Sequence, residues 1–174
     1  MQQKVAVGLV SFVVTALIAG LALPGEWQVE RELIVRGPSS PLNEAVVDLS
    51  TWAEWSQWRS GVVNGLQVEY PGSMAGVGAV QTWQGGESAS GLLRITEVDA
   101  GGGIRFDLER GSLASRAQLL FEEFGSDTRV VWREEGDLGV GPISGWRALM
   151  LDGLLGPGIE RQLAGLSAYA ERPH

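Results

Sequence analysis

The sequence predicts an α+β fold in which a curved antiparallel sheet of about six to seven strands wraps around one long C-terminal helix. Glycine supplies 25 of the 174 residues, about twice the usual ~7%, which favours many tight turns and therefore strands. Apolar and polar side chains alternate from residue 66 to residue 136, whereas helical spacing returns over 144–171. A sheet with one apolar face needs a cover, and only the last segment is long enough to provide it.

An uncharged apolar run begins the chain. Residues 5–23 contain only Ser11 and Thr15 as polar side chains, and a helix of that length spans about 28 Å, close to the ~30 Å hydrocarbon core of a bilayer. We favour an uncleaved membrane anchor. The alternative is a cleaved signal peptide, for which residues 20–22 are the only fair cleavage site.

This interpretation divides the chain into an anchor, residues 1–25, and a domain, residues 26–174. Lys4 and the free amine precede the apolar run, and positive charge tends to stay in the cytoplasm. We therefore expect a single-pass membrane protein that contacts the membrane through residues 5–23 and whose domain is extracytoplasmic.

The domain opens with a strand and two short helices. Residues 27–36 alternate as a strand with one mainly apolar face. A helix follows through Asp48, with Ser39 or Ser40 as its N-cap, and Ser50 or Thr51 caps a second short helix. Six further strands are expected near 66–70, 77–84, 89–98, 104–108, 114–124 and 130–136, before a helix over 144–171.

The second short helix carries three of the seven tryptophans. Trp52, Trp55 and Trp58 stand at i, i+3 and i+6, which places them on one side of a helix. Each indole buries roughly 150–250 Å². One interpretation is a core helix that closes one end of the sheet, and the other is that the rings also line a ligand cavity. In the last helix, Pro157 should kink the helix or divide it.

Composition excludes several kinds of chemistry. The chain has no Cys, and its one His is the last residue, His174, so disulfides, thiolate nucleophiles and sites built on Cys or His ligands are excluded. We expect no metal and no cofactor. The net charge is −8 and the basic residues are scattered, so no basic patch exists to neutralise phosphates, and nucleic acid is not an expected partner.

Residues 29–58 resemble the polyketide cyclase/dehydrase-like branch of the SRPBCC (START-like, helix-grip) superfamily. The signature W-x-x-W-S-x-W is similar to Trp52, Trp55-Ser56 and Trp58. Weaker matches are Val29-Glu30-Arg31, Pro38, Asp48, Gly76-Val77-Gly78, Trp83, Ile95-Thr96-Glu97, Thr128-x-Val130-x-Trp132, Gly136, Gly156, Glu160 and Leu163. The resemblance covers the chain after residue 26 and implies a helix-grip domain, whose members bind lipids, sterols or polyketides and in some cases catalyse cyclisation or hydrolysis.

A pocket between the sheet and the C-terminal helix is plausible, because a helix laid across a curved sheet rarely fills the space. Glu134 is the strongest single candidate for a catalytic residue. The period of two puts it on the same face as Trp132, where desolvation would raise its pKa and suit it to general acid or base catalysis. The alternative is a strand-end residue in solvent. The expected pocket residues are Trp52, Trp55, Trp58, Trp83, Phe106, Trp132, Met150 and Leu154.

Three functional hypotheses follow. The leading one is a membrane-anchored domain that binds a hydrophobic small molecule or lipid in this pocket without chemistry. The second is a cyclase or hydratase that uses Glu134, with Tyr70 or Arg31 in support. In that case Arg31 faces inward as a polar anchor, whereas the alternative pairs it with Glu30 or Glu32. The third is a packed module that binds another protein.

Overall fold

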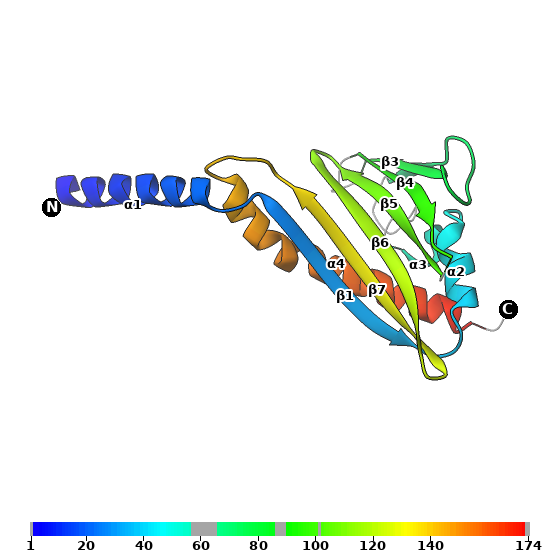
Figure 1. The fold of residues 1–174 in the computed structure, drawn as a ribbon. Helices are drawn as coiled ribbons and strands as arrows, with labels where there is room; N and C mark the ends of the chain where they lie inside the picture. Colours follow the sequence, from blue (N-terminus) through cyan, green and yellow to red (C-terminus); the bar gives the residue numbers. More distant parts are fainter. Residues whose placement is uncertain (1, 57–65, 86–89, 101, 173–174) are drawn as a thin grey trace.

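The computed structural model describes residues 2–56, 66–85, 90–100 and 102–172. After one N-terminal helix, the elements follow the predicted order (Figure 1). This order is a strand, two short helices, six further strands and a long helix. Their bounds are α1 Gln2–Ala22, β1 Glu26–Val35, α2 Ser40–Val47, α3 Trp52–Trp55, β2 Gln67–Glu69, β3 Val80–Gln84, β4 Gly91–Val98, β5 Gly103–Arg110, β6 Leu113–Phe124, β7 Asp127–Asp137 and α4 Ser144–Ala170.

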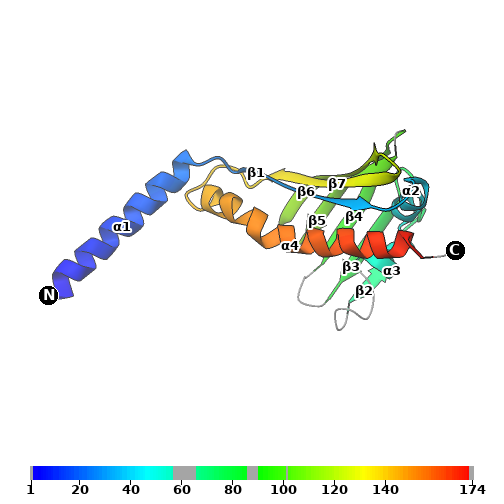
Figure 2. The ribbon, with the colours of Figure 1, turned by 90° about the horizontal axis from the view of Figure 1, so that it is seen from below.

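The strands form one seven-stranded antiparallel sheet in the order β1-β7-β6-β5-β4-β3-β2. Helix α4 lies along one face of this sheet, mainly against β1 (Figure 2). The short helices α2 and α3 close one end of the molecule and contact the second half of α4. The predicted fold class and its layers are therefore confirmed.

The inner face of the sheet carries the core, as the alternating pattern requires. On β5 the fully buried residues are Ile104, Phe106 and Leu108, and on β7 the buried residues continue every second position from Thr128 to Glu134. The outer face carries charged side chains that pair across strands. Examples are Arg133 with Glu30 at 2.5 Å and Arg105 with Glu97 at 2.5 Å.

The short helices are held differently from the predicted capping. Ser39 and Thr51 are the N-cap residues of α2 and α3, but neither side chain makes a capping bond within the described chain. Instead, Thr51 Oγ1 donates to the carbonyl oxygen of Ala45 at 2.6 Å. Trp52 Nε1 donates to the carbonyl oxygen of Val46 at 3.1 Å. These bonds fix α3 against the end of α2, so the tryptophan helix is oriented by its neighbour.

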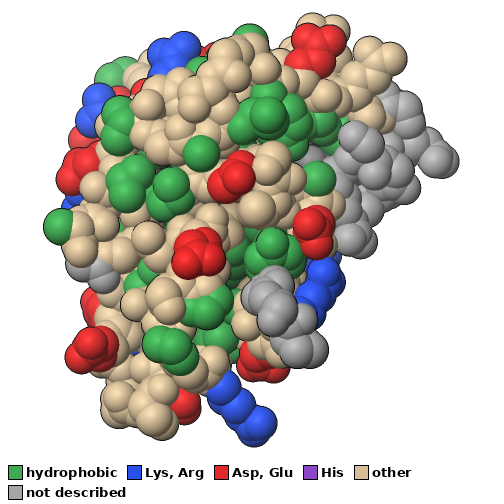
Figure 3. Space-filling view, turned by 90° about the vertical axis from the view of Figure 1, so that its right-hand side faces the viewer, with side chains coloured by type: hydrophobic (Ala, Val, Ile, Leu, Met, Phe, Trp, Pro, Cys, Tyr) green, Lys and Arg blue, Asp and Glu red, His purple; other side chains and the backbone are tan. Residues whose placement is uncertain are grey.

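The end of the molecule that carries α2, α3 and the C-terminus is shown in Figure 3. Hydrophobic side chains on this face are interspersed with acidic ones, and the few basic side chains lie near its edges. This distribution agrees with the scattered arginines of the sequence.

The prediction of a membrane anchor, and with it the single-pass extracytoplasmic location, is wrong. In the described part of the chain, no helix is both long and apolar enough to cross a bilayer. The C-terminal turns of α1 also pack on the start of α4: Trp146 Nε1 donates to the carbonyl oxygen of Ala16 at 3.0 Å. A Cβ on Gly20 would meet Trp146 Nε1 at 2.8 Å. The portion of α1 before this contact is shorter than the ~20 residues a span needs.

Helix α4 is a single helix of 27 residues that continues through Pro157, so of the two predicted outcomes, a kink or a division, the division does not occur. It docks on α3 through Gly165. A Cβ at this position would overlap the carbonyl oxygen of Trp55. The absence of a side chain at residue 165 therefore sets how closely α4 approaches the tryptophan helix.

The two glycines Gly165 and Gly153 of α4 offer a matched test of this docking. We expect Gly165→Ala to lower the free energy of unfolding by about 1–3 kcal/mol, because backbone must move to admit the methyl group. Nothing lies within 4 Å of a Cβ at Gly153, so Gly153→Ala should instead stabilise by about 0.5–1 kcal/mol through helix propensity. Urea unfolding followed by circular dichroism measures both. A stabilising Gly165→Ala would contradict the close approach.

Candidate functional site

The inner face of the sheet meets α3 in an aromatic cluster formed by Trp52, Trp55, Phe106 and Trp132. The ring centroids of Trp52 and Trp55 are 4.5 Å apart. Phe106 packs edge-on against Trp52 at 5.7 Å and against Trp132 at 5.6 Å. Such edge-to-face pairs are favourable because the edge of one ring is positive and the face of the other negative. The cluster joins α3, β5 and β7 at the centre of the inner face.

The structure brings together some of the predicted pocket residues and separates others. Trp52 contacts the rings of Trp55, Phe106 and Trp132, and Phe106 also contacts Trp132. Trp83 is buried on β3. Met150 and Leu154 are 62% and 67% exposed, on the side of α4 away from its buried residues. Trp58 lies outside the described residues. Whether a ligand contacts any of these side chains stays a prediction.

Glu134 lies on the inner face, two residues beyond Trp132, and is fully buried. The expectation that it shares a face with Trp132 is confirmed, and the alternative of a strand-end residue in solvent is wrong. Its carboxylate accepts hydrogen bonds from one residue of β5 and one residue of β6. Arg110, at the end of β5, donates from Nη2 to Glu134 Oε1. Ser115, near the start of β6, donates from Oγ to the same oxygen at 2.7 Å.

Arg110, Glu134 and Ser115 form a polar cluster on an otherwise apolar face, which we call the Arg110–Glu134–Ser115 cluster. Within it, Arg110 and Glu134 form an ion pair. Burial lowers the pKa of the Arg110 guanidinium to about 10, because the interior disfavours its charged form. The guanidinium is still protonated at neutral pH, and Glu134 supplies the opposite charge. Two buried polar atoms of the pair, Glu134 Oε2 and Arg110 Nε, have no hydrogen-bond partner among the described residues. The cluster therefore has capacity for one further acceptor and one further donor.

Arg31 and Tyr70 lie apart from this cluster. Arg31 Nη1 donates to the backbone carbonyl oxygen of Glu30 at 2.8 Å, but its ion pairs are with α4 and not with the carboxylates of Glu30 or Glu32. On α4, Nη1 donates to Asp152 Oδ1 and Nε donates to Glu160 Oε1, both at 2.8 Å. These bonds raise the pKa of Arg31, and the bond from Arg31 lowers the pKa of Asp152. Burial and the nearby charge of Asp48 raise the pKa of Tyr70, which places Tyr70 at the α2–α3 end. Arg31 thus fastens β1 to α4 and is not available to support Glu134.

Comparison with solved structures shows which fold this is. A norcoclaurine synthase point mutant from Thalictrum flavum, in complex with a transition-state analogue, matches with a TM-score of 0.65 at 13% identity over 83% of this chain and 94% of that chain. A protein from Thermus thermophilus matches with a TM-score of 0.61 at 20% identity over 82% and 96%. The major latex-like protein 151 of Panax ginseng matches with a TM-score of 0.56 at 16% identity over 84% and 99%. The chain has a helix-grip fold.

No family model and no curated protein matches the sequence. The likeness therefore extends to the helix-grip fold and not to an activity, since one fold hosts many functions. Among the described residues, no three His, Cys, Asp or Glu side chains are grouped so that they could hold a metal ion.

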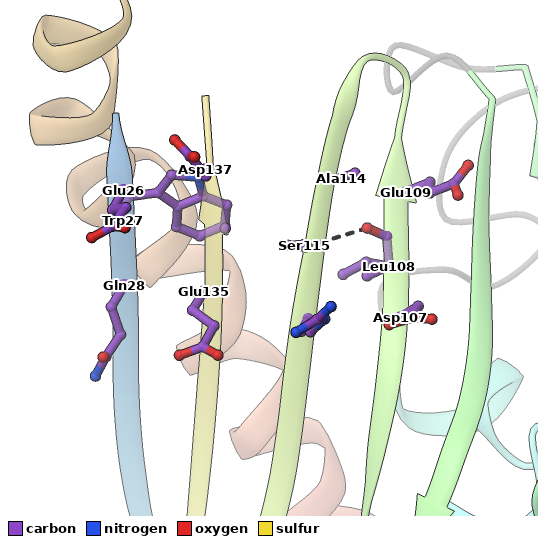
Figure 4. Close-up of a pocket in the computed structure, with 12 residues that line it drawn as sticks. Glu26, Trp27, Gln28, Asp107, Leu108, Glu109, Ala114, Ser115, Glu135 and Asp137 are labelled. Atoms are coloured by element: carbon purple, nitrogen blue, oxygen red, sulfur yellow. Dashed lines mark hydrogen bonds between the residues drawn. The ribbon is translucent and has the colours of Figure 1, made fainter. Parts of the chain in front are cut away.

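The two pockets described in this helix-grip structure lie on the outer face of the sheet. The larger has a volume of about 820 Å³. It lies where β7 and β6 part: their register ends at the pair Arg116–Glu135, whereas β7 continues beside β1 as far as Asp137. Figure 4 shows the resulting gap between β7 and β6, with the pocket residues on both sides of it. We call this the split-strand groove. A smaller pocket of about 450 Å³ adjoins it and shares Asp107, Arg116 and Glu135.

Sequence reasoning missed Arg110 and Ser115. The signal was available in the period of two, because Arg110 has the same parity as Phe106 and Leu108 on β5, and Ser115 has the same parity as Ala117 on β6. Arg110 ends β5 at the turn that contains Gly111, and Ser115 is the third residue of β6. A polar side chain so near a turn is usually assigned to solvent. What the alternation could not give is the register that places both beside Glu134.

Proposed function

We propose that this helix-grip domain binds a hydrophobic small molecule in the space between the inner face of the sheet and α4, without performing chemistry on it. The observation that carries the proposal is the Arg110–Glu134–Ser115 cluster, because it is a polar site on a face that is otherwise apolar and aromatic. Small-molecule pockets combine apolar walls with a few placed polar groups. The norcoclaurine synthase of the same fold holds a transition-state analogue, which supports the binding of a small molecule by this fold.

The cluster suggests the character of the ligand. A buried ion pair contributes little net stability compared with well-packed apolar residues, and a buried polar atom without a partner is costly. Glu134 Oε2 calls for a hydrogen-bond donor and Arg110 Nε for an acceptor. A hydrophobic molecule with one neutral polar group that both donates and accepts would satisfy both atoms.

The test compares what the wild-type protein and two tryptophan variants retain. Ala117 is buried beside both Phe106 and Glu134, so Ala117→Trp fills the proposed space, whereas Ala164→Trp adds the same ring to the exposed side of α4. Each protein is stripped of bound molecules, incubated with a cell extract, repurified and analysed by mass spectrometry. We expect the wild type and Ala164→Trp to retain the same species and Ala117→Trp to retain at least tenfold less.

If no protein retains a species, and the solved structure shows the inner face filled by side chains, binding is contradicted and a packed interaction module is favoured. Ala117→Leu, a smaller change, serves the same purpose if Ala117→Trp does not fold. It should then retain less of the species than the wild type.

The second candidate is a cyclase or hydratase in which Glu134 acts as general acid or base. Two observations favour it: Glu134 is completely buried, and it accepts hydrogen bonds from Arg110 and Ser115. Burial and hydrogen bonding are the means by which proteins adjust the pKa of a catalytic carboxyl group. In this case the retained species would change its chromatographic retention or mass during incubation with the wild type, and Glu134→Gln would retain it unchanged. An unchanged species with the wild type supports binding alone.

A further inference from the structure

The split-strand groove differs in charge from the rest of the outer face. Its rim carries five carboxylates from three strands, β1, β5 and β7, with Arg116 as the one basic side chain among the lining residues. The carboxylates belong to Glu26, Asp107, Glu109, Glu135 and Asp137. Figure 4 shows them on both sides of the gap between β7 and β6. Negative charge therefore predominates around a hollow of about 820 Å³.

None of these five carboxylates forms an ion pair with another described residue, whereas acidic side chains elsewhere on the outer face do. Glu30 pairs with Arg133, Glu32 and Glu122 share Arg129, and Glu97 and Asp99 share Arg105. Like charges gathered without cationic partners repel one another. The groove would lose that repulsion on binding a cation.

The floor of the groove contains a second, independent feature. Trp27 is 7% exposed, and its Nε1 has no hydrogen-bond partner among the described residues. The indole extends from β1 across Gly136, where a Cβ would meet its Cζ2 at 2.8 Å and the carbonyl oxygen of Ala114 at 2.9 Å. The ring thus reaches the point at which the strands part, and it lines the groove there. A buried indole N–H calls for an acceptor, and the indole face attracts cations.

Ser115 adds a hydrogen-bond acceptor to the same floor. Its hydroxyl donates to Glu134 Oε1 at 2.7 Å or to the carbonyl oxygen of Leu108 at 3.3 Å, so its oxygen lone pairs can accept from a ligand. A ligand that matches the groove therefore has positive charge for the carboxylates, an oxygen for Trp27 Nε1, and N–H or O–H groups for Ser115.

We propose that the split-strand groove binds a small organic cation that carries at least two amino groups and at least one hydroxyl. This groove shares Ser115 with the Arg110–Glu134–Ser115 cluster, but its carboxylates lie on the outer face, and the proposal does not depend on the function proposed above. Five carboxylates accommodate more than one ammonium group, and the hydroxyl supplies the oxygen that a plain polyamine lacks.

The experiment uses the indole N–H signals of the full ¹⁵N-labelled chain in two-dimensional NMR. The signal lost in Trp27→Phe is that of Trp27. The probes are 1,3-diamino-2-propanol, 1,3-diaminopropane, which lacks the hydroxyl, and glycerol, which lacks the charges. We expect the diamino alcohol to shift the Trp27 signal saturably, 1,3-diaminopropane to bind at least about threefold more weakly, and glycerol to produce no saturable shift.

Two variants with equal changes in net charge locate the site. Glu109→Gln/Glu135→Gln removes two carboxylates from the groove, and Glu44→Gln/Glu123→Gln removes two from elsewhere. The first should raise the dissociation constant of the diamino alcohol about three- to tenfold, and the second should change it less than twofold. If both double variants bound the diamino alcohol equally more weakly than the wild type, the attraction would be a non-specific effect of net charge, and the proposed site would be wrong. The proposal would also be wrong if neither amine shifted the Trp27 signal saturably, or if the two amines bound with equal affinity. The same holds if MgCl₂ shifted the Trp27 signal as much as the diamino alcohol does.

Discussion

Replacing Arg110 with leucine is expected to destabilise the protein by about 3–5 kcal/mol, because it leaves the Glu134 carboxylate buried without its counter-charge. Glu134 is fully buried, so water cannot take over the role of the guanidinium. Ser115 would remain as a donor to Oε1, but a neutral hydroxyl does not offset a full negative charge. The measurement is the free energy of unfolding in urea at pH 7, with circular dichroism as the probe.

A double variant separates loss of the pair from loss of a single residue. Arg110→Leu/Glu134→Leu removes both charges, so the buried carboxylate no longer incurs a penalty, and the double variant should be more stable than Arg110→Leu. Arg94→Leu, an exposed arginine of β4, serves as the control and should change stability by less than about 0.5 kcal/mol. Two results would show that the two side chains act independently. One is a decrease of less than about 1 kcal/mol in the free energy of unfolding of Arg110→Leu, and the other is a double variant less stable than both single variants.

The comparison of sequence with structure shows where local patterns suffice. Alternation predicts the inner faces of β1 and of β3 to β7, because each of these strands buries one side. It therefore placed Glu134 beside Trp132 correctly. The ends of strands are predicted less accurately: the alternation extends the third strand back to Val77, whereas β3 begins at Val80. Gly76 and Gly78 adopt φ values of +77° and +86°, which a strand does not accommodate.

The failures have one common cause, which is contact between segments distant in the sequence. Arg31 bonds to residues 121 and 129 positions away, and no pattern within β1 selects those partners over its neighbours Glu30 and Glu32. The apolar run of α1 has the length of a membrane span when considered alone. Its contact with Trp146 joins positions 130 residues apart, and only the folded chain shows it. Sequence spacing likewise could not show that β7 and β6 part beyond Arg116 and Glu135.

The tryptophan helix provides the second large expected effect. Trp52 is fully buried and contacts Trp55, Phe106 and Trp132. Trp52→Ala should destabilise by about 3–5 kcal/mol through the cavity it leaves, with each aromatic contact accounting for roughly 0.5–1.5 kcal/mol beyond buried area. The free energy of unfolding in urea measures the loss, and near-ultraviolet circular dichroism reports whether the remaining rings keep their packing.

The matched variant Trp52→Phe distinguishes packing from hydrogen bonding. Phenylalanine keeps an aromatic ring between α3 and β5 but loses the bond from Nε1 to the carbonyl oxygen of Val46, so it should cost about 1–2 kcal/mol. If the two variants lost equal stability, the hydrogen bond would be what fixes α3. If Trp52→Ala cost less than about 1 kcal/mol, the ring would not be part of the core. The expected order, a large loss for alanine and a smaller one for phenylalanine, follows because Trp52 both fills the centre of the inner face and ties α3 to α2.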